Sequence, residues 1–214
     1  MWFVVRANVD ARRCAAKLRV QLAPSVQLGK RISLEIHPGS VNALYVGANS
    51  VIGDDTALHF LGGSIVIGEG AVIRRGCQAD TSGELRIGDE CIISYGTYMH
   101  CASSLTIEEM VGIGEYTTIT DSVHVRTPID VYFAHHVTSA PTRIGRNCWL
   151  GAHAVIGAGV HVGEGAVIGA NSTVIKDVPA GWLAAGSPAK AVKALDVVDV
   201  DVESIRGRRP PGRG

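Results

Sequence analysis

The chain has 214 residues, of which 46% are hydrophobic and 5% aromatic, with 26 glycines and a formal net charge of zero. This length accommodates one domain with a short appendage, and the apolar fraction is high enough to bury a core. The balanced charge gives no global field that would attract nucleic acid or an acidic membrane, and no apolar stretch approaches the roughly 20 residues of a membrane span.

The first element expected along the chain is a short amphipathic helix within residues 10–22, where basic side chains alternate with Leu, Ala and Cys. We therefore assign residues 1–25 to an N-terminal helical segment that closes or flanks the domain behind it. The same segment could instead dock on a partner or an acceptor site. Residues 26–45 are interpreted as an imperfect first coil of the main domain, which we place at residues 26–192.

A six-residue repeat dominates the rest of that domain. Between residues 144 and 178 an aliphatic residue recurs at every sixth position, and a small or β-branched residue follows four positions after each. The aliphatic positions are Ile144, Leu150, Ile156, Val162, Ile168 and Val174. Upstream, blocks in the same frame open at Val46, Ile67, Ile87 and Ile107, 20 or 21 residues apart. No helix has a period of six, so the repeat predicts an all-β solenoid of triangular coils with one short strand per side.

The interior of such a solenoid explains the cysteines. Cys77, Cys91 and Cys148 occupy the small-residue position of the repeat, which predicts a packing role for each. The five cysteines are odd in number and show no CxxC spacing, so neither a disulfide framework nor a zinc ribbon is expected. A reduced, cytoplasmic protein fits this usage.

The repeat is interrupted once. It fails after Ile119 and resumes at Ile144, and we interpret residues 124–141, which include His135 and His136, as an extruded loop. Long loops on rigid scaffolds are commonly functional, and this one could reach a neighbouring subunit. Beyond the repeats we expect a short helix or strand near residues 189–198, with a disordered tail over residues 193–214.

Three segments carry a resemblance to a known family. The stretches IGRNCWLG (144–151), GANSTVIKDVP (169–179) and AAGSP (184–188) resemble the C-terminal half of galactoside and maltose O-acetyltransferases, which are hexapeptide-repeat acyltransferases. The resemblance implies a left-handed parallel β-helix that forms a homotrimer with active sites between subunits. The handedness rests on the resemblance alone, since ordinary crossovers are right-handed.

The resemblance also implies catalytic groups. Extending it without a gap from Ile107 places His124 at the catalytic histidine, at the root of the loop. An acceptor hydroxyl needs a base to take its proton as it attacks a thioester, and an imidazole suits that role. From the residues alone, a solvated loop histidine is an equal alternative. The oxyanion donor of the family is a backbone N–H just after the W-[IL]-G turn, which here belongs to Ala152.

Further residues would bind the two substrates. The resemblance places acetyl-CoA in a slot between adjacent solenoids, with Trp149, Ala152 and Ala170 along the pantetheine arm and Lys176 and Lys190 near the adenosine phosphates. The lysines could instead be solvated surface charges, and Trp149 could pack at a subunit interface. On the acceptor side, the asparagine of the sugar acetyltransferases maps to Ser94. His100 follows an inward position and could face outward into the same cleft.

The sequence thus predicts an acyl-CoA-dependent O-acetyltransferase acting on a sugar or glycan hydroxyl, with acetyl-CoA as co-substrate and no metal, membrane or nucleic acid involved. An N-acetyltransferase acting on an amino sugar or small xenobiotic, and a non-catalytic β-helix scaffold, remain alternatives. A γ-type carbonic anhydrase would share the solenoid, but its zinc needs two histidines five residues apart, and no two of the eight histidines have that spacing.

Overall fold

A computed structural model describes residues 15–126, 128 and 136–196. The described residues form strands, turns and bends, and no helix occurs among them. The strands make up three long sheets and one two-stranded ribbon. The protein is therefore an all-β solenoid, as the repeat predicts.

The strand bounds follow the three sides of the solenoid. Sheet A contains β1 (Lys17–Leu22), β4 (Val41–Val46), β7 (Ser64–Ile67), β10 (Glu84–Ile87), β13 (Ser104–Ile107), β18 (Thr142–Ile144) and β21 (His161–Val162). Sheet B contains β2 (Gln27–Leu28), β5 (Val51–Ile52), β8 (Val72–Ile73), β11 (Ile92–Ile93), β14 (Gly112–Ile113), β19 (Trp149–Leu150), β22 (Val167–Ile168), β24 (Trp182–Gly186) and β25 (Ala189–Ala194). Sheet C contains β3 (Ser33–Ile36), β6 (Ala57–Phe60), β9 (Gln78–Thr81), β12 (Tyr98–Cys101), β15 (Thr118–Thr120), β20 (Val155–Ile156) and β23 (Thr173–Val174). The ribbon pairs β16 (Ser122–His124) with β17 (Val137–Ser139).

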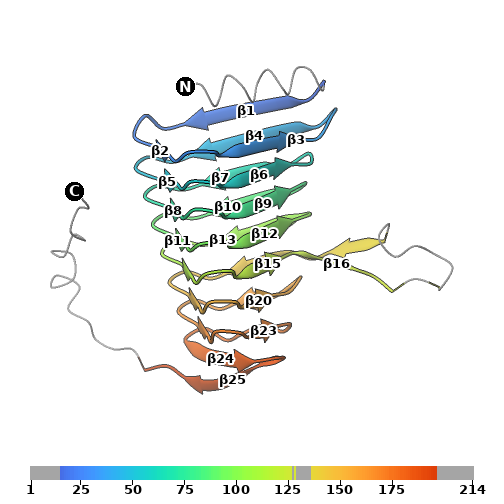
Figure 1. Ribbon diagram of the computed structural model, residues 1–214. Coiled ribbons are helices and arrows are strands. Elements are labelled where there is room, and N and C mark those ends of the chain that lie inside the picture. The colour runs from blue at the N-terminus through green and yellow to red at the C-terminus, as the bar shows by residue number, and fades with distance from the viewer. Residues whose placement is uncertain (1–14, 127, 129–135, 197–214) are drawn as a thin grey trace.

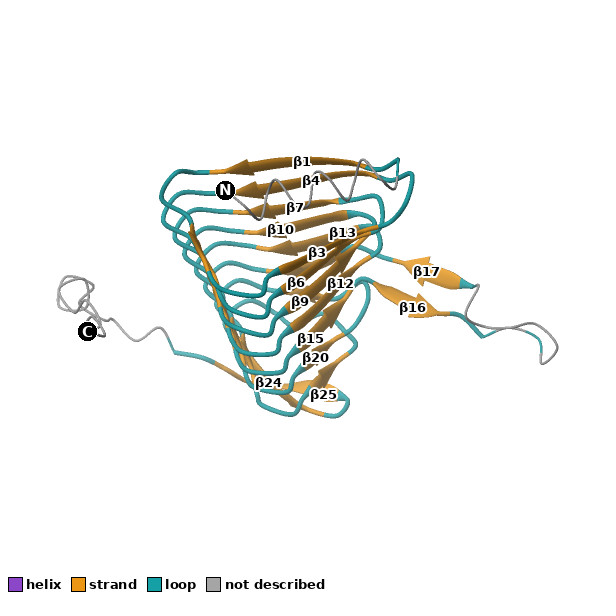
Figure 2. Ribbon diagram, turned by 45° about the horizontal axis from the view of Figure 1, so that its top comes forward, coloured by secondary structure: helices purple, strands orange, loops and turns teal. Residues whose placement is uncertain are grey.

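Each coil runs from sheet A through sheet B to sheet C, and the coils stack along one axis (Figure 1). Sheets A and C have seven strands each, which corresponds to seven coils, and the strands of successive coils pair in parallel. Seen obliquely from above, the stack has a triangular outline, and β16 and β17 project from one corner (Figure 2). This architecture is consistent with the left-handed parallel β-helix that the family resemblance implies.

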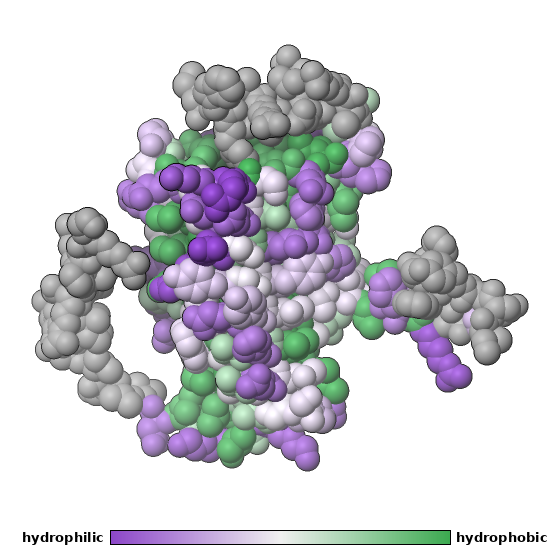
Figure 3. Space-filling model, in the orientation of Figure 1, coloured by the Kyte–Doolittle hydropathy of each residue, from purple (hydrophilic) through white to green (hydrophobic). Residues whose placement is uncertain are grey.

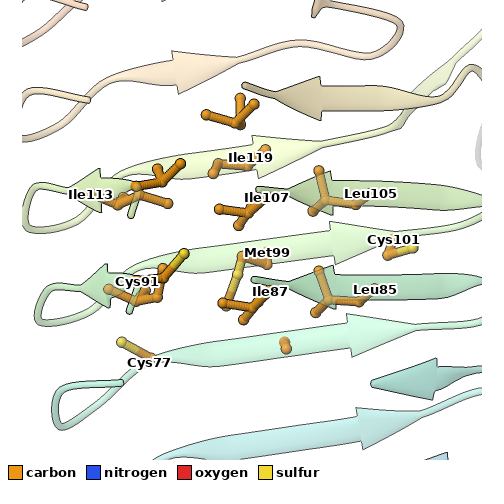
Figure 4. Packing of buried hydrophobic residues seen from close by; sticks show 14 of the residues in the cluster. Cys77, Leu85, Ile87, Cys91, Met99, Cys101, Leu105, Ile107, Ile113 and Ile119 are labelled. Carbon is orange, nitrogen blue, oxygen red and sulfur yellow. The ribbon is translucent and has the colours of Figure 1, made fainter. Parts of the chain in front are cut away.

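The core is a set of vertical columns of aliphatic side chains. Leu85 lies one coil from Leu105, and Ile87 one coil from Ile107, all four pointing inward (Figure 4). None of these four side chains is more than 2% exposed. Burying an aliphatic side chain of this size contributes about 1.5 to 3 kcal/mol. Because each coil buries its residues only against its neighbours, the stack is stable as a unit.

The first coil differs from the prediction. Residues 17–22 form strand β1, which pairs in parallel with β4, so the expected helical segment over residues 1–25 is wrong for this part. Lys17 and Arg19 are exposed while Leu18 is buried, a period of two that belongs to a strand with one buried face. The first coil therefore begins at residue 17 and not at residue 26. The expectation for residues 1–14 lies outside the described residues.

The last coil is closed by a hairpin. Strand β24 pairs in parallel with β22, and β25 folds back on β24 in the antiparallel direction. The element expected near residues 189–198 is therefore a strand, and residues 193 and 194 belong to it and not to a tail. The remainder of the predicted tail, residues 197–214, lies outside the described residues.

Polar and weakly polar residues cover much of the middle of the face seen in Figure 3, while apolar side chains gather at both ends of the stack, the lower end being formed by the C-terminal coils. Ile175 and Val192, both 59% exposed, belong to these coils. Nothing in the described part of the chain is a helix long and apolar enough to cross a membrane.

The cysteines of the repeat are buried as predicted. Cys77, Cys91 and Cys148 are at most 2% exposed and fill the small interior position of their coils. Cys101 is also buried, at the end of β12. Burial raises the pKa of each of these thiols to about 11, because the charged thiolate would lose its hydration.

These thiols are expected to resist alkylation in the folded protein. With a pKa of about 11, roughly one thiol in a thousand is ionised near pH 8. Treatment with iodoacetamide followed by peptide mass mapping should leave all four cysteines unmodified in the native protein and modified after denaturation. Rapid native labelling of any of the four would contradict the burial described here.

Candidate functional site

The regular stack of coils is interrupted at one of its three edges. Between β15 of sheet C and β18 of sheet A the chain leaves the stack through β16 and returns through β17 (Figures 1 and 2). We call the series of corners between sheets C and A the C–A edge. Residues 127 and 129–135, and with them the predicted loop residue His135, lie outside the described residues.

A buried carboxylate lies where the chain leaves the stack, just before β16. Asp121 is fully buried, and its oxygens accept hydrogen bonds from the backbone N–H groups of Ala102, Ser103 and Ser104 at 2.6, 2.7 and 2.7 Å. The Ser103 hydroxyl donates a further bond at 3.1 Å. The Asp121 carbonyl in turn accepts the N–H of Ala140, where the chain returns. Asp121 thus holds together both ends of the loop and the corner of the preceding coil.

A comparison with the corner at residues 82–84, one coil earlier in the chain, explains why a carboxylate is needed. There the corner N–H groups of Ser82 and Glu84 donate to the carbonyls of Cys101 and Ser103 in the next coil. At the corner formed by residues 102–104, the chain that would supply such carbonyls has turned outward into β16. The Asp121 side chain supplies the missing acceptors, which prevents three backbone donors from remaining unpaired.

Two histidines meet at this loop root. His100, on the outward side of β12, contacts Ser122 through its Nδ1 atom, 2.9 Å from the hydroxyl oxygen. Ser122 and His124 are two residues apart on β16, so their side chains lie on the same face of the ribbon. His124 itself is exposed and pairs across the ribbon with Val137. The structure therefore brings both predicted histidines to the C–A edge.

Other predicted residues lie at a different edge. Ser94 follows β11, Ala152 follows β19 and Ala170 follows β22, so all three occupy corners between sheets B and C, which we call the B–C edge. Ala152 and Ala170 are at least partly exposed, whereas Ser94 is only 6% exposed. Lys190, on β25, lies opposite Ala185 at the same end of sheet B and is exposed.

The Ala152 amide is available for a bound molecule. In the first coil the equivalent corner N–H, that of Lys30, donates to the Asp54 carboxylate of the next coil at 2.7 Å. At Ala152 the corresponding residue of the next coil is Ala170, which has no acceptor in its side chain. Among the described residues, none accepts a hydrogen bond from the Ala152 N–H.

Exposed aromatic rings lie close to this amide along the chain or in the adjoining coil. Trp149, 52% exposed, lies across Gly112, where an added Cβ would come within 2.6 Å of the indole ring. Tyr116 stacks on His153, the residue after Ala152, with ring centroids 5.4 Å apart and planes inclined by 18°. An apolar wall beside a free backbone donor is the arrangement that an acyl chain with one polar carbonyl requires.

Lys176 does not join this group. It follows β23 of sheet C and precedes Val178, which bridges to β21 of sheet A, so it lies at the C–A edge. Within one chain, the histidines and Lys176 are thus separated from Trp149, Ala152, Ala170 and Lys190 by the width of sheet C. Four or five residues at about 3.3 Å each make this face about 15 Å wide.

Sequence reasoning missed Asp121. Asp121 lies two residues after Ile119, so on a strand its side chain would point inward like that of Ile119. The six-residue repeat ends at Ile119, however, and we therefore interpreted the following residues as a loop. The described residues contain no group of three or more His, Cys, Asp or Glu side chains that could hold a metal ion.

Comparisons with known proteins agree with the repeat. The family profile described as bacterial transferase hexapeptide (six repeats) matches residues 141–176. Galactoside O-acetyltransferase of Escherichia coli is 34% identical over 116 residues, which are 48% of this chain and 57% of that protein. This chain thus spans little more than half of that relative. Nodulation protein L of Rhizobium meliloti is 34% identical over 145 residues, covering 66% of this chain and 79% of the relative.

Solved structures share the fold. A hexapeptide-repeat-containing acetyltransferase of Vibrio cholerae, crystallised with acetyl-coenzyme A, superposes with a TM-score of 0.56 at 29% identity and covers 61% of this chain and 70% of its own. An N-acyltransferase of Bacillus cereus in complex with dTDP and coenzyme A gives a TM-score of 0.57 at 16% identity, covering 84% and 89% of the two chains. The second likeness, at this low identity, concerns the fold alone.

Replacing Asp121 tests the loop root. Asp121→Ala should lower the free energy of unfolding by about 3 to 5 kcal/mol, because three partly buried N–H groups lose a charged acceptor. Urea unfolding measures the loss, and hydrogen exchange should accelerate at the amides of residues 102–104. Asp89→Ala is the matched control, since Asp89 accepts one exposed N–H, that of Glu69, and its loss should cost at most about 1 kcal/mol. Equal losses for the two variants would contradict the assigned role.

Proposed function

Because this chain belongs to the hexapeptide-repeat acyltransferases, we propose that it is an acetyl-CoA-dependent O-acetyltransferase acting on a hydroxyl group of a sugar or glycan. The observation that carries the proposal is the open Ala152 amide beside Trp149, in a chain whose loop root presents His124. The O-acetyl transfer named for the Escherichia coli relative supports the choice of a hydroxyl over an amine.

The site is proposed to form between two chains. Catalysis needs the histidine and the oxyanion donor within reach of the same reacting carbonyl and hydroxyl groups. In one solenoid, however, His124 and the Ala152 N–H lie at different edges. A homotrimer with its axes parallel would set the C–A edge of one subunit against the B–C edge of the next. The exposed Trp149 and Tyr116 would then face the neighbouring loop root, which is the burial that large exposed aromatics usually find.

The proposed chemistry is a direct acyl transfer. His124 takes the proton of the acceptor hydroxyl as its oxygen attacks the thioester carbonyl carbon. The tetrahedral intermediate places its negative charge on the former carbonyl oxygen, where the Ala152 N–H donates a hydrogen bond. When the intermediate collapses, the C–S bond breaks and the coenzyme A thiolate leaves, taking the proton that His124 holds. Trp149 and Ala170 would line the pantetheine arm, and Lys190 would reach the phosphates of the donor.

His100 is proposed to act on the acceptor side. Its Nδ1 atom is engaged by Ser122, which leaves Nε2 directed away from that contact and able to bind an acceptor hydroxyl. Ser94 would contribute from the B–C edge of the neighbouring subunit. Because Ser94 is only 6% exposed and its backbone N–H and C=O are already hydrogen-bonded, this contribution requires a small movement of the corner.

Substitution of His124 tests the proposal. His124→Ala should lower kcat by about 10² to 10⁴-fold, because the general base is lost, while acetyl-CoA binding measured by calorimetry remains. The assay follows coenzyme A release with a thiol reagent in the presence of a panel of galactosides, glucosides and amino sugars. His161→Ala, which removes an exposed histidine from sheet A, is the matched control and should retain full activity. Full transfer by the His124 variant, or failure of the assembled protein to bind acetyl-CoA, would refute the assignment.

A further inference from the structure

A ladder of polar side chains runs along sheet C toward the loop root. The strand register places Glu35, His59, Asp80, His100 and Thr120 at equivalent outward positions of five successive coils. The equivalent strands of sheet B offer mostly apolar or glycine residues, such as Val51, Val72, Ile92 and Gly112. The row of polar side chains is therefore confined to sheet C, and it lies near the C–A edge.

The centre of the ladder is held rigidly by Asp80. Its carboxylate contacts His59 Nδ1 at 2.7 Å and accepts hydrogen bonds from the Tyr98 hydroxyl at 2.6 Å and from Gln78 Nε2 at 3.0 Å. The side chains of His59 and Asp80 are only 24% and 17% exposed. Burial, and then the Asp80 carboxylate, raise the pKa of Tyr98, so its hydroxyl remains a donor. Solvated surface side chains rarely form so complete a set of contacts.

This ladder ends in a hollow. A depression of about 310 Å³ is lined by Glu35, Ile36, His37, His59, Leu61 and Asp80. Because Asp80 engages Nδ1 of His59, its Nε2 atom points toward the exposed Glu35 carboxylate, 3.7 Å away, too far for a hydrogen bond between them. In a neutral His59 this Nε2 is an acceptor, so an ammonium group could donate to both Nε2 and Glu35, and two neighbouring sugar hydroxyls could each donate to one of them. Ile36 and Leu61 supply apolar contacts for the C–H face of a ring.

The charge of the hollow restricts its occupant. Its described lining includes two carboxylates and neither Lys nor Arg. A phosphate or nucleotide diphosphate would meet only like charges there, whereas hydroxyl and amino groups would find acceptors. The lining therefore favours a neutral or cationic polyhydroxyl compound.

We infer that this hollow is a distal subsite for an oligosaccharide acceptor that carries no phosphate, an inference that rests on the proposed function. Successive coils are about 4.8 Å apart and the residues lining the hollow lie two to four coils from Thr120, so the hollow lies about 10 to 19 Å along the C–A edge from that level. A monosaccharide at His124 cannot span this distance, but a chain of several sugars can follow the ladder past His100 and Asp80. The acceptor is then a glycan whose end is acetylated at the loop root.

The experiment compares acceptor lengths. Acetyl transfer is measured with glucose and its oligomers up to the pentasaccharide, together with the 2-amino-2-deoxy series of the same lengths. In the natural protein KM should fall about tenfold from monosaccharide to pentasaccharide. Glu35→Gln and His59→Gln should each remove most of this gain by raising the KM of the pentasaccharide, with little effect on kcat. Glu84→Gln, which alters a half-exposed carboxylate on sheet A, is the control and should keep the full gain.

The outcomes separate the two proposals. Transfer to saccharides without any gain for longer chains, or equal KM increases for short and long acceptors in the Glu35 and His59 variants, would overturn the distal subsite alone. A lower KM for a nucleotide-diphosphate sugar than for the free pentasaccharide would also overturn it. Failure to acetylate any saccharide, with or without acetyl-CoA binding, would overturn the proposed function and the subsite with it.

Discussion

The structure depends on one constraint, which is that a backbone donor shielded from solvent in one coil must find an acceptor, usually in the coil beside it. In the regular part of the stack the carbonyl groups of the next coil meet this requirement. Where the chain leaves the stack after β15, those carbonyls are missing, and the buried Asp121 carboxylate replaces them. A rigid solenoid can thus carry a projecting loop without unpaired donors in its interior.

The same constraint explains why the chemistry lies at the edges. The strands of the faces engage their N–H and C=O groups in the sheets, while the corner amides pair with carbonyls or side chains of an adjacent coil or remain open. Asp54 satisfies the Lys30 amide, but Ala170 leaves the Ala152 amide open. One edge therefore offers free donors and the other offers histidines on a loop. We propose that a trimer joins them, and that the polar ladder beside the loop orients a long acceptor.

Much of the fold follows from the sequence, because a six-residue period allows few structures. The inward positions of Ile87, Ile107 and Ile168 and the packing of the cysteines are confirmed. Strand β1 was mistaken for a helix because residues 10–22 were taken together as one amphipathic segment, whereas residues 17–22 alone alternate with a period of two and pair with β4. Asp121 escaped notice since an acidic residue in an aliphatic frame suggests an exposed loop. His124 and Ala152 are far apart because they occupy different corners of the solenoid. The six-residue period does not by itself reveal which corner a residue occupies.

The most direct test of a site shared between subunits is complementation between two inactive variants. His124→Ala removes the base at the C–A edge, and Ala170→Trp fills the donor slot at the B–C edge, where Ala170 is exposed. Each variant alone should be inactive. Co-expression should restore about one quarter of the natural acetyl transfer, because random assortment pairs two intact edges at that frequency. Mixed assemblies that form but remain inactive would contradict a site built from two chains.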